Sequence, residues 1–408
     1  MANNKEKKVL NVPNSTDRGN VIRNVPHLRF PEFTDEWKKC KLGDLCNVLM
    51  CKRILASQTN TEDGVPFYKI GTIGSTPDAY ISKELFDDYK VKYSYPHKGE
   101  VMITCAGTVG KCVVYDGEDA YFQDSNIVWI DNPTQNISNG FLFHLLSKVD
   151  WRKLNSTTII RIYNDDLRNL KMSYPQKEEQ QKISHLLSLL DERITTQNKI
   201  IEDLKKLKSA IIDYAIDSLD ANFMKFGYLY ETAGEGGTPT TSNASFYDNG
   251  KIPFIKIDDL KKKYLVENND FITELGLQKS SAWLVPTQSI LFSNGASIGE
   301  ITITTYPVCT KQGILGIVPK SNIDVEFLYY FMSSSYFKKA ISRIVTEGTM
   351  KTAYLKDINN IRCPIPTKEK QQEIAKIPSA INSKIDFEQS ILRLFYAQKQ
   401  YLLRQMFI

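Results

Sequence analysis

Residues 175–183 read PQKEEQQKI, and residues 366–374 read PTKEKQQEI. The two stretches agree at six of nine positions, and the second follows the first by 366 − 175 = 191 residues. The similarity continues backward, where NDDLRNL (164–170) corresponds to LKDINNI (355–361). Repetition within one chain predicts that one structural plan occurs twice.

Each copy begins with a strand-like region that is punctuated by glycine. EVMITCAGTVG (100–110) resembles QSILFSNGASIG (288–299). Such runs of β-branched and aromatic residues predict strands. A helix before the final strand is predicted in each copy, at NGFLFHLLSKVDWRKL (139–154) and VEFLYYFMSSSYFKKAISRIV (325–345). We therefore expect an α+β fold with two repeated mixed α/β domains.

Each copy ends in a stretch with the period of a long helix. Apolar residues recur there at steps of three and four, as in the seam of a coiled coil. They are Ile183, Leu187, Leu190, Ile194, Ile201, Leu204, Ile211 and Ala215 in the first copy, and Ile374, Ile381, Ile385, Leu392, Phe395, Leu402 and Met406 in the second. Polar residues interrupt the seam at equivalent places, first at Gln197 and Glu388, then at Lys208 and Lys399.

The matching interruptions favour two helices that pair with each other in a fixed register as a coiled coil. We expect the pairing to be antiparallel, because the chain runs out along one helix, builds a domain and returns along the other. The alternative is that each helix packs only on its own domain, and shared ancestry alone would also produce matching interruptions. Pro378 stands where the first copy has Leu187. Because proline removes a backbone hydrogen bond, the second helix is expected to start later or to bend there.

The expected organisation has five parts and an approximate two-fold axis. They are a disordered tail (1–27), a first globular domain (28–174), a first spacer helix (175–219), a second globular domain (220–365) and a second spacer helix (366–408). One target with a repeated, two-fold character is duplex DNA, whose grooves recur every ~34 Å.

Composition limits the class of protein. A chain of 408 residues is too long for one ordinary core. It has no apolar run of the ~18 residues that a membrane span needs and no apolar secretory segment at its start. Its seven cysteines are an odd number, which favours free thiols in a reducing cytoplasm. The net charge of +5 permits nucleic-acid binding without arguing for it. We expect a cytoplasmic protein without membrane contact.

Two patterns imitate catalytic motifs. Asp78, Asp88 and Lys90 resemble the carboxylates and lysine of a metal-dependent nuclease. The second copy does not reproduce them, so a solvated loop and helix face is the preferred interpretation. CAGTVGKC (105–112) is not a phosphate-binding loop, because cysteines occupy its first position and the position after the lysine. We interpret it as a glycine-rich turn between strands, with close approach to DNA as the functional alternative.

Metal and methyl-transfer chemistry is not indicated either. Cys40, Cys46 and Cys51 lack the close-spaced pair and the fourth ligand of a structural zinc site. His144 lies in an apolar helix and is interpreted as a core residue. N-P-P-Y-type and F-x-G-x-G motifs of methyltransferases are absent from the sequence. We expect no metal, no cofactor bound by this chain and no catalysis of its own.

The opening LRFPEFTDEWKKCKLGDL (28–45), the doubled PxxExQQxI block and the domain–helix–domain–helix order resemble the specificity subunit of type I restriction-modification systems. The resemblance runs from about residue 28 to residue 408. It implies two target-recognition domains that each read one half of a split site in double-stranded DNA, with the paired helices setting the gap. It also implies assembly with two modification (methyltransferase) subunits and with restriction–translocation subunits, which would bind S-adenosylmethionine, ATP and Mg²⁺. The rivals are a protein-binding scaffold and a nuclease.

Candidate contact residues come from the repeated regions. Base edges and phosphates are contacted mainly by basic, amide and hydroxyl side chains. The candidate DNA-binding residues are Lys111, Gln123, Thr158, Arg161, Asn294, Lys311, Gln312, Thr349 and Lys351. For each one alone, a solvated surface residue is the alternative.

The start of each long helix repeats a second set of polar residues. The candidate partner-binding residues there are Lys177, Glu178, Gln180, Gln181, Lys368, Glu369, Gln371 and Gln372. Their repetition suits a surface that two equivalent partner subunits recognise. Acidic residues in a first turn also suit the helix dipole, which is the structural alternative.

Overall fold

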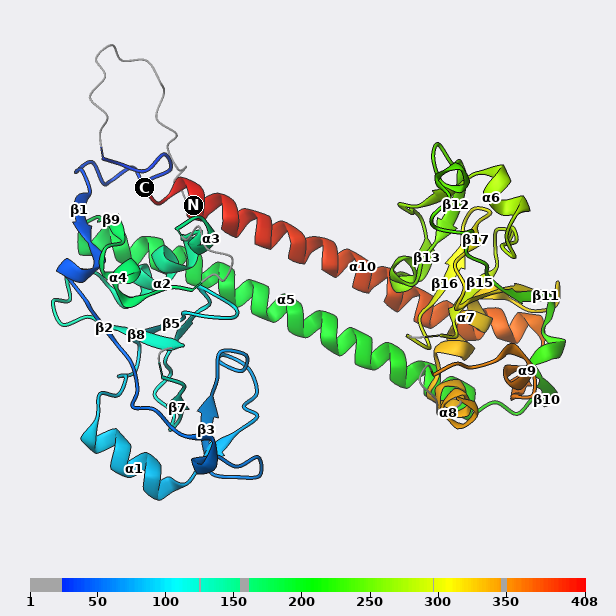
Figure 1. The fold of residues 1–408 in the computed structure, drawn as a ribbon, viewed down its shortest axis with the longest axis horizontal. Coiled ribbons are helices and arrows are strands. Elements are labelled where there is room, and N and C mark those ends of the chain that lie inside the picture. The colour runs from blue at the N-terminus through cyan, green and yellow to red at the C-terminus, as the bar shows by residue number, and fades with distance from the viewer. Residues whose placement is uncertain (1–23, 125, 155–160, 296, 346–350) are drawn as a thin grey trace, which may run out of the picture. The chain divides into compact units, whose positions relative to one another are not determined.

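The computed structural model describes residues 24–124, 126–154, 161–295, 297–345 and 351–408 (Figure 1). These residues form two compact units. Unit 1 holds the described residues up to 196 together with 391–408, and unit 2 holds 197–390. The helices α5 (Lys177–Asp217) and α10 (Lys368–Gln405) each contribute one part to unit 1 and the other part to unit 2. In the described part of the chain, no helix has the length and apolar character to cross a membrane.

Unit 1 is built on three small sheets. The first sheet has the strand order β2 (Asn47–Leu49), β8 (Ile127–Asp131), β5 (Val101–Thr104) and β6 (Cys112–Val114). The second has the order β4 (Tyr80–Ile81), β3 (Val65–Tyr68) and β7 (Tyr121–Phe122). The third pairs β1 (Lys38–Lys41) with β9 (Lys171–Tyr174). Its shorter helices are α1 (Lys83–Lys92), α2 (Asn139–Lys148), α3 (Trp151–Leu154) and α4 (Asn164–Arg168).

Unit 2 repeats this topology. Its first sheet has the strand order β11 (Tyr230–Glu235), β18 (Ile314–Pro319), β15 (Ile290–Ser293), β16 (Ile301–Thr304) and β13 (Tyr264–Leu265). The second has the order β14 (Phe271–Ile272), β12 (Ile252–Ile255) and β17 (Cys309–Thr310). The third pairs β10 (Asn222–Lys225) with β19 (Arg362–Ile365). Its shorter helices are α6 (Glu274–Gln278), α7 (Val325–Ser333), α8 (Ser335–Ile344) and α9 (Leu355–Ile358). The predicted duplication of a mixed α/β domain is therefore confirmed, and β13 is an addition in unit 2.

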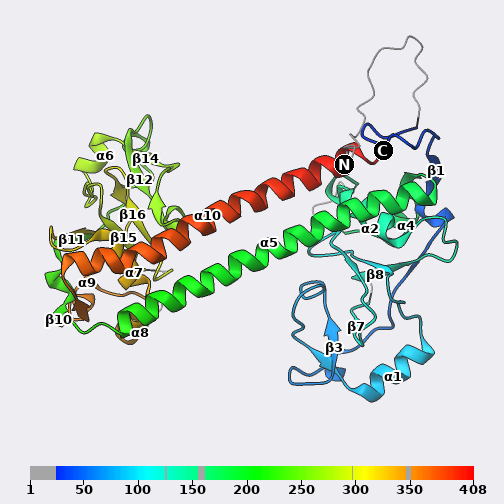
Figure 2. The same ribbon diagram turned by 180° about the vertical axis from the view of Figure 1, so that it is seen from behind.

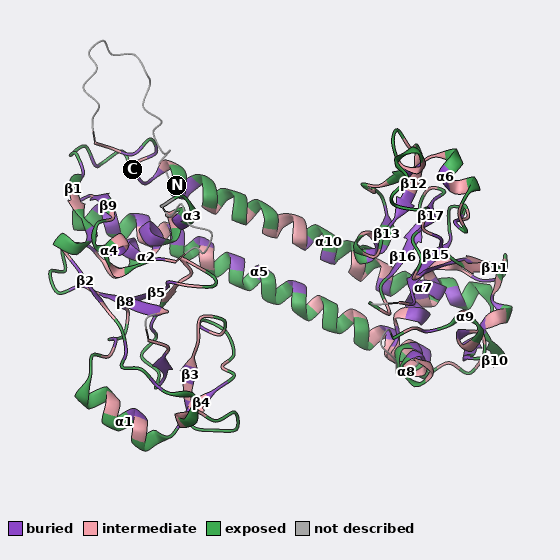
Figure 3. Ribbon diagram, viewed as in Figure 1, coloured by how far each residue is buried: buried purple, intermediate pink, exposed green. Residues whose placement is uncertain are grey.

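The central strands are apolar on both faces because both faces are covered. In β5, Val101 and Ile103 join a core with α2, whereas Met102 faces a second cluster with Phe67. The same alternation occurs in β15 of unit 2, between the cores on its two sides. A strand buried on both sides reads as a continuous hydrophobic run, as VMIT and ILFS do. Figure 3 shows the buried residues concentrated in these strands and in α2 and α7.

The core of unit 1 also includes both ends of the chain that the structure describes. Trp37 packs edge-on against Phe141 of α2 and against Phe407, with ring centroids 5.6 Å and 6.3 Å away. Leu187 of α5 and Met406, just after α10, are fully buried in the same core. Unit 1 therefore cannot complete its core from the first half of the sequence alone.

Within each unit, the parts of α5 and α10 lie side by side (Figures 1 and 2). In unit 1, Lys399 of α10 pairs with Asp191 of α5. In unit 2, Lys208 of α5 donates to Asn382 of α10 at 2.9 Å. Residue numbers rise along one helix as they fall along the other, so the predicted antiparallel pairing is confirmed.

The predicted interruptions of the seam are the residues that make these contacts. Gln197 donates its amide to the Glu388 backbone carbonyl at 3.1 Å and to the Glu388 carboxylate. Lys208 and Lys399 each meet a polar partner on the opposite helix, and those partners are also 191 residues apart in the sequence. The Gln197–Glu388 pair is buried and the two lysine pairs are half-buried. Polar pairs of this kind fix the register of a coiled coil, because a slipped register would leave them unpaired.

Pro378 neither delays nor ends α10. The helix begins at Lys368, which follows the start of α5 at Lys177 by the repeat offset, and it continues through the buried Pro378 to Gln405. The prediction of a later start is therefore wrong. The first turns on the N-terminal side of the proline are anchored independently, because Gln371 and Ala375 are both buried in unit 2. This tertiary packing offsets the single backbone hydrogen bond that proline removes.

His144 is a core residue, as predicted, and it gives unit 1 a pH-dependent stability. The side chain is 1% exposed, and burial lowers its pKa from 6.5 to about 4. Below pH 6.5 the unfolded chain binds a proton that the folded chain does not. Stability is therefore expected to fall as the pH falls from about 6.5 to about 4, by up to roughly 3 kcal/mol.

Urea unfolding at pH 7 and pH 5 checks this expectation. His144→Leu should reduce the loss between the two pH values, whereas replacement of the exposed His185 by Gln should leave the loss unchanged. An identical pH dependence for His144→Leu and the unmodified protein would contradict the assignment.

Candidate DNA interface

Three loop segments of unit 1 meet at one place, which we call the loop junction. They are the turn after β5, the loop after β7 and the segment before α4. Cys105 in the turn donates its backbone N–H to Asn126 at 2.8 Å and accepts from the N–H of Ile162 at 2.9 Å. Gln123 donates its N–H to Tyr68 at the end of β3, at 2.9 Å. The junction is therefore held by backbone hydrogen bonds, which leaves side chains free to vary.

Unit 2 builds the same loop junction with equivalent bonds. Asn294 in the turn after β15 donates its backbone N–H to Gly313 at 3.0 Å and accepts from the N–H of Ala353 at 2.9 Å. Lys311 donates its N–H to Ile255 at the end of β12, at 2.9 Å. The two regions that the sequence singled out as repeated loops are thus brought together in both units.

In unit 1 the predicted side chains lie at or beside the junction. The Lys111 ammonium donates to the Ile73 carbonyl at 2.5 Å, and the Gln123 side-chain oxygen accepts from the N–H of Ile70 at 3.4 Å. Both are half-buried and support the loop after β3. The Arg161 guanidinium lies 5.9 Å from the ring centre of Tyr163, which is 61% exposed. Thr158 lies outside the described residues.

In unit 2 the predicted side chains divide into two groups. Lys311, Gln312 and Lys351 are exposed, and Lys351 borders a cavity of about 320 Å³ beside Gly299. Asn294 is only 1% exposed, and its amide donates to the Ala353 carbonyl at 3.2 Å. Asn294 therefore holds the junction together from inside, which corrects the prediction that it contacts DNA. Thr349 lies outside the described residues.

The repeated glutamines at the helix starts have a structural role. Gln180 is fully buried; its side-chain oxygen accepts from the N–H of Ser138 at 2.7 Å, and its amide donates to the Pro175 carbonyl at 2.9 Å. Gln371 does the same in unit 2, accepting from the N–H of Asp324 at 2.8 Å and donating to Pro366 at 2.9 Å.

Ser138 and Asp324 are the N-cap residues of α2 and α7, so each glutamine joins the start of a long helix to the start of a core helix. Both side chains are satisfied within the chain and inaccessible to a partner. This corrects the prediction that Gln180 and Gln371 belong to a partner-binding surface. The remaining predicted residues there, Lys177, Glu178, Gln181, Lys368, Glu369 and Gln372, are exposed.

Sequence reasoning missed the role of Glu179, a fully buried charge within this block. Its carboxylate is fully buried and pairs with Arg29, whose Nε and one terminal nitrogen lie 2.7 Å from its two oxygens. The Trp37 indole N–H also donates to it, at 3.3 Å. The repeat could not reveal Glu179, because the equivalent residue in the second copy is Lys370.

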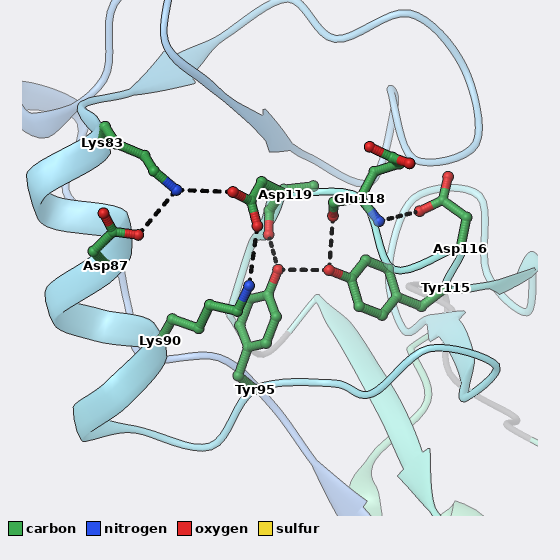
Figure 4. Close-up of polar contacts among 9 residues, drawn as sticks. Lys83, Asp87, Lys90, Tyr95, Tyr115, Asp116, Glu118 and Asp119 are labelled. Atoms are coloured by element: carbon green, nitrogen blue, oxygen red, sulfur yellow. Dashed lines mark hydrogen bonds and ion pairs between the residues drawn. The ribbon is translucent and has the colours of Figure 1, made fainter.

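The nuclease-like residues are not assembled into a site. Each of them forms a separate ion pair: Asp78 with Lys69 at 3.1 Å, Asp88 with Lys92 at 2.6 Å, and Lys90 with Asp119 at 3.0 Å. Figure 4 shows Lys90 and Lys83 from α1 converging on the Asp119 carboxylate. These hydrogen bonds lower the pKa of Asp119. The lysine of the nuclease-like pattern thus anchors α1 to the loop before β7.

The thiols of Cys46 and Cys51 are buried. Burial raises the pKa of Cys46 and of Cys51 to about 12, so neither is poised to ionise. Among the residues that the structure describes, no group of three or more histidine, cysteine or acidic side chains is placed to hold a metal ion.

Known proteins share this architecture. The family model described as the type I restriction modification DNA specificity domain matches twice, at residues 34–206 and 220–394. A Haemophilus influenzae protein named as a type I restriction enzyme specificity subunit is 50% identical over 171 residues, which are 42% of this chain and 44% of that relative. The matched part thus spans less than half of this relative's length.

Two further relatives cover nearly the whole chain. A Methanocaldococcus jannaschii protein named as a type I restriction enzyme specificity subunit is 23% identical over 88% of this chain and 89% of its own. The crystal structure of the type I restriction-modification S subunit from Mycoplasma genitalium aligns with a TM-score of 0.57 at 17% identity, over 94% of this chain and 99% of that one. Because the family model covers most of the sequence in two copies, the chain belongs to the type I restriction modification DNA specificity domain family.

Proposed function

We propose that the chain is the DNA-specificity subunit of a type I restriction-modification complex. Each unit reads one half of a bipartite site in double-stranded DNA, and the paired helices set the gap between the halves. The observation that carries this proposal is the duplicated loop junction. Equivalent backbone bonds, such as Ile162 to Cys105 and Ala353 to Asn294, hold the loops in both units. The exposed side chains on this common frame differ, as two readers of different sequences require.

The exposed junction side chains suit DNA. Lys311 and Lys351 supply positive charge for phosphates, and Gln312 supplies an amide for base edges. In unit 1 the equivalent position of Lys311 is Gln123, because both donate their backbone N–H to the end of the neighbouring strand. We assign no catalytic role to any of these residues; methylation and cleavage belong to partner subunits.

The proposed partners are two modification subunits and the restriction–translocation subunits. S-adenosylmethionine, ATP and Mg²⁺ would bind to those partners. The support in this chain is the exposure of Lys177, Glu178 and Gln181 at the start of α5 and of their equivalents at the start of α10. The seven cysteines are free thiols, which suits the cytoplasm as the proposed location.

Methylation mapping in cells with and without this chain, beside the modification subunit, tests the function. We expect methylation of a split sequence only when the chain is present. In vitro, the complex should retard DNA carrying that sequence more than scrambled DNA, and less as salt rises. Binding without sequence preference would support a scaffold instead. Cleavage by the isolated chain with Mg²⁺, abolished by Asp88→Ala, would support a nuclease.

A further inference from the structure

The chain that leaves β11 lies in backbone contact with the loop junction of unit 2. A Cβ atom added to Gly236 would sit 2.2 Å from the Thr310 carbonyl oxygen. One added to Gly237 would sit 2.3 Å from the backbone nitrogen of Ala282. Neither position accepts any other residue without moving backbone, so the two glycines bring the segment that follows them against the loop after β17.

Hydrogen bonds tie this segment to the residues that the sequence predicted as DNA contacts. The Thr238 hydroxyl oxygen accepts from the N–H of Gln312 at 3.3 Å. The Glu235 carboxylate accepts from the N–H of Gly313 at 2.9 Å. Glu235 and Thr238 are thus bonded to the backbone of Gly313 and Gln312, next to Lys311.

The residues just beyond, 240–243, form what we call the hydroxyl loop. Its members are Thr240, Thr241, Ser242 and Asn243, and all four are exposed. The loop is held on both sides. The Tyr247 hydroxyl donates to the Pro239 carbonyl at 2.5 Å, and Asn243 accepts from the N–H of Ser245 at 3.2 Å. Exposed hydroxyls on a fixed backbone can hydrogen-bond to either donors or acceptors on base edges. The run from Gly236 to Tyr247 carries no acidic residue, and the carboxylate of the preceding Glu235 accepts from the N–H of Gly313.

In unit 1, the segment in the equivalent position carries different side chains. The chain that leaves β2 is tied to the loop after β7 by Arg53, whose Nε lies 2.7 Å from the Asp124 carboxylate. This segment carries the basic residues Lys52 and Arg53 where unit 2 carries hydroxyls. The two segments therefore occupy equivalent positions in the two units, but their side chains differ in chemistry.

We propose that the hydroxyl loop is a specificity-determining part of unit 2, and that its hydroxyls hydrogen-bond to bases of the half-site that unit 2 reads. The inference rests on the proposed function and adds residues outside the predicted set. The hydroxyl loop follows Thr238, which accepts from the N–H of Gln312 next to Lys311. Lys311 would hold the phosphate backbone while Thr240, Thr241 and Ser242 reach into the groove.

A variant with Thr240→Val, Thr241→Val and Ser242→Ala tests the proposal, because it removes three hydroxyls with little change of shape. In complex with the modification subunit, we expect binding to the full site to weaken about 10-fold or more, with relaxed preference at the unit 2 half-site only. The unit 1 half-site and the gap should not change. Thr232→Val, at an exposed position within β11, is the matched control and should bind as the unmodified protein does.

The outcomes separate the two levels of inference. If the unmodified complex shows no split site, the proposed function fails. If it does, and the triple variant methylates the same sequences with the same affinity, only the role of the hydroxyl loop fails. A loss that is equal for all sequences and that lowers the salt dependence would indicate phosphate contacts, and would also overturn the assignment of specificity.

Discussion

Four residues inserted into each long helix are expected to lengthen the unread gap of the DNA site and to leave both half-sites unchanged. The insertion points should face each other, after Asn198 in α5 and after Phe387 in α10, because Gln197 contacts Glu388. The contacts on either side, such as Lys208 to Asn382, then keep their partners. Four residues advance a helix by about 6 Å and turn it by about 40°.

The rotation of about 40° determines how many base pairs the insertion adds to the gap. One base pair turns the duplex by about 35°, given 10 to 10.5 base pairs per turn. An insertion of four residues is therefore expected to add about one base pair to the gap, which methylation mapping measures. An insertion in α5 alone separates Lys208 from Asn382 and should abolish methylation of the original and of the lengthened site. Altered half-sites with an unchanged gap would show that the helices do not set the spacing.

The duplication and the helical pairing could be predicted because both leave patterns in the order of the residues: a repeated motif and a regular spacing of apolar residues. Gln197 and Glu388 interrupt an apolar seam at equivalent positions, and in the structure they contact each other. The strands of the central sheets were visible as apolar runs because they are buried on both faces. The repeat pointed to equivalent loops in the two units, but that these loops meet at one junction was not predicted and comes from the structure.

The roles of single side chains could not be predicted in the same way. Gln180 sits in the first turn of a helix, where a polar residue is normally exposed, and it is buried only because the start of α2, 42 residues earlier, lies against it. The repeat did not distinguish it. Both copies keep this glutamine, but they also keep the next one, Gln181 and Gln372, which is exposed. Identity between the copies therefore does not by itself indicate a buried hydrogen-bonding role.

The hydroxyl loop was missed for the opposite reason. Its counterpart in unit 1 carries Lys52 and Arg53, so comparing the copies gave no similarity. Both segments rest on the loop after an equivalent strand, through Arg53 in unit 1 and Thr238 in unit 2. The sequence repeat identifies the backbone structure that the two units share. The residues that would give the units different DNA preferences differ between the copies, so the repeat does not reveal them.

Replacing Arg29 by alanine is expected to destabilise unit 1 by about 3–5 kcal/mol, because it leaves a buried carboxylate without its cation. Glu179 is fully buried, and Arg29 contacts both of its oxygens at 2.7 Å. The arginine also donates to the Asp35 carbonyl at 2.7 Å, so the loss should release the segment that leads to Trp37. Unfolding by urea, followed by tryptophan fluorescence, measures the change.

Two matched variants decide whether the buried charge is the cause. Adding Glu179→Gln to Arg29→Ala should restore much of the stability, since a neutral amide has a far smaller desolvation cost than a carboxylate. Lys182→Ala removes the neighbouring exposed ion pair with Glu32 and should cost at most about 1 kcal/mol. If Arg29→Ala were as mild as Lys182→Ala, the N-terminal segment would not depend on Glu179. The buried Arg29–Glu179 ion pair would then stabilise unit 1 no more than an exposed ion pair does.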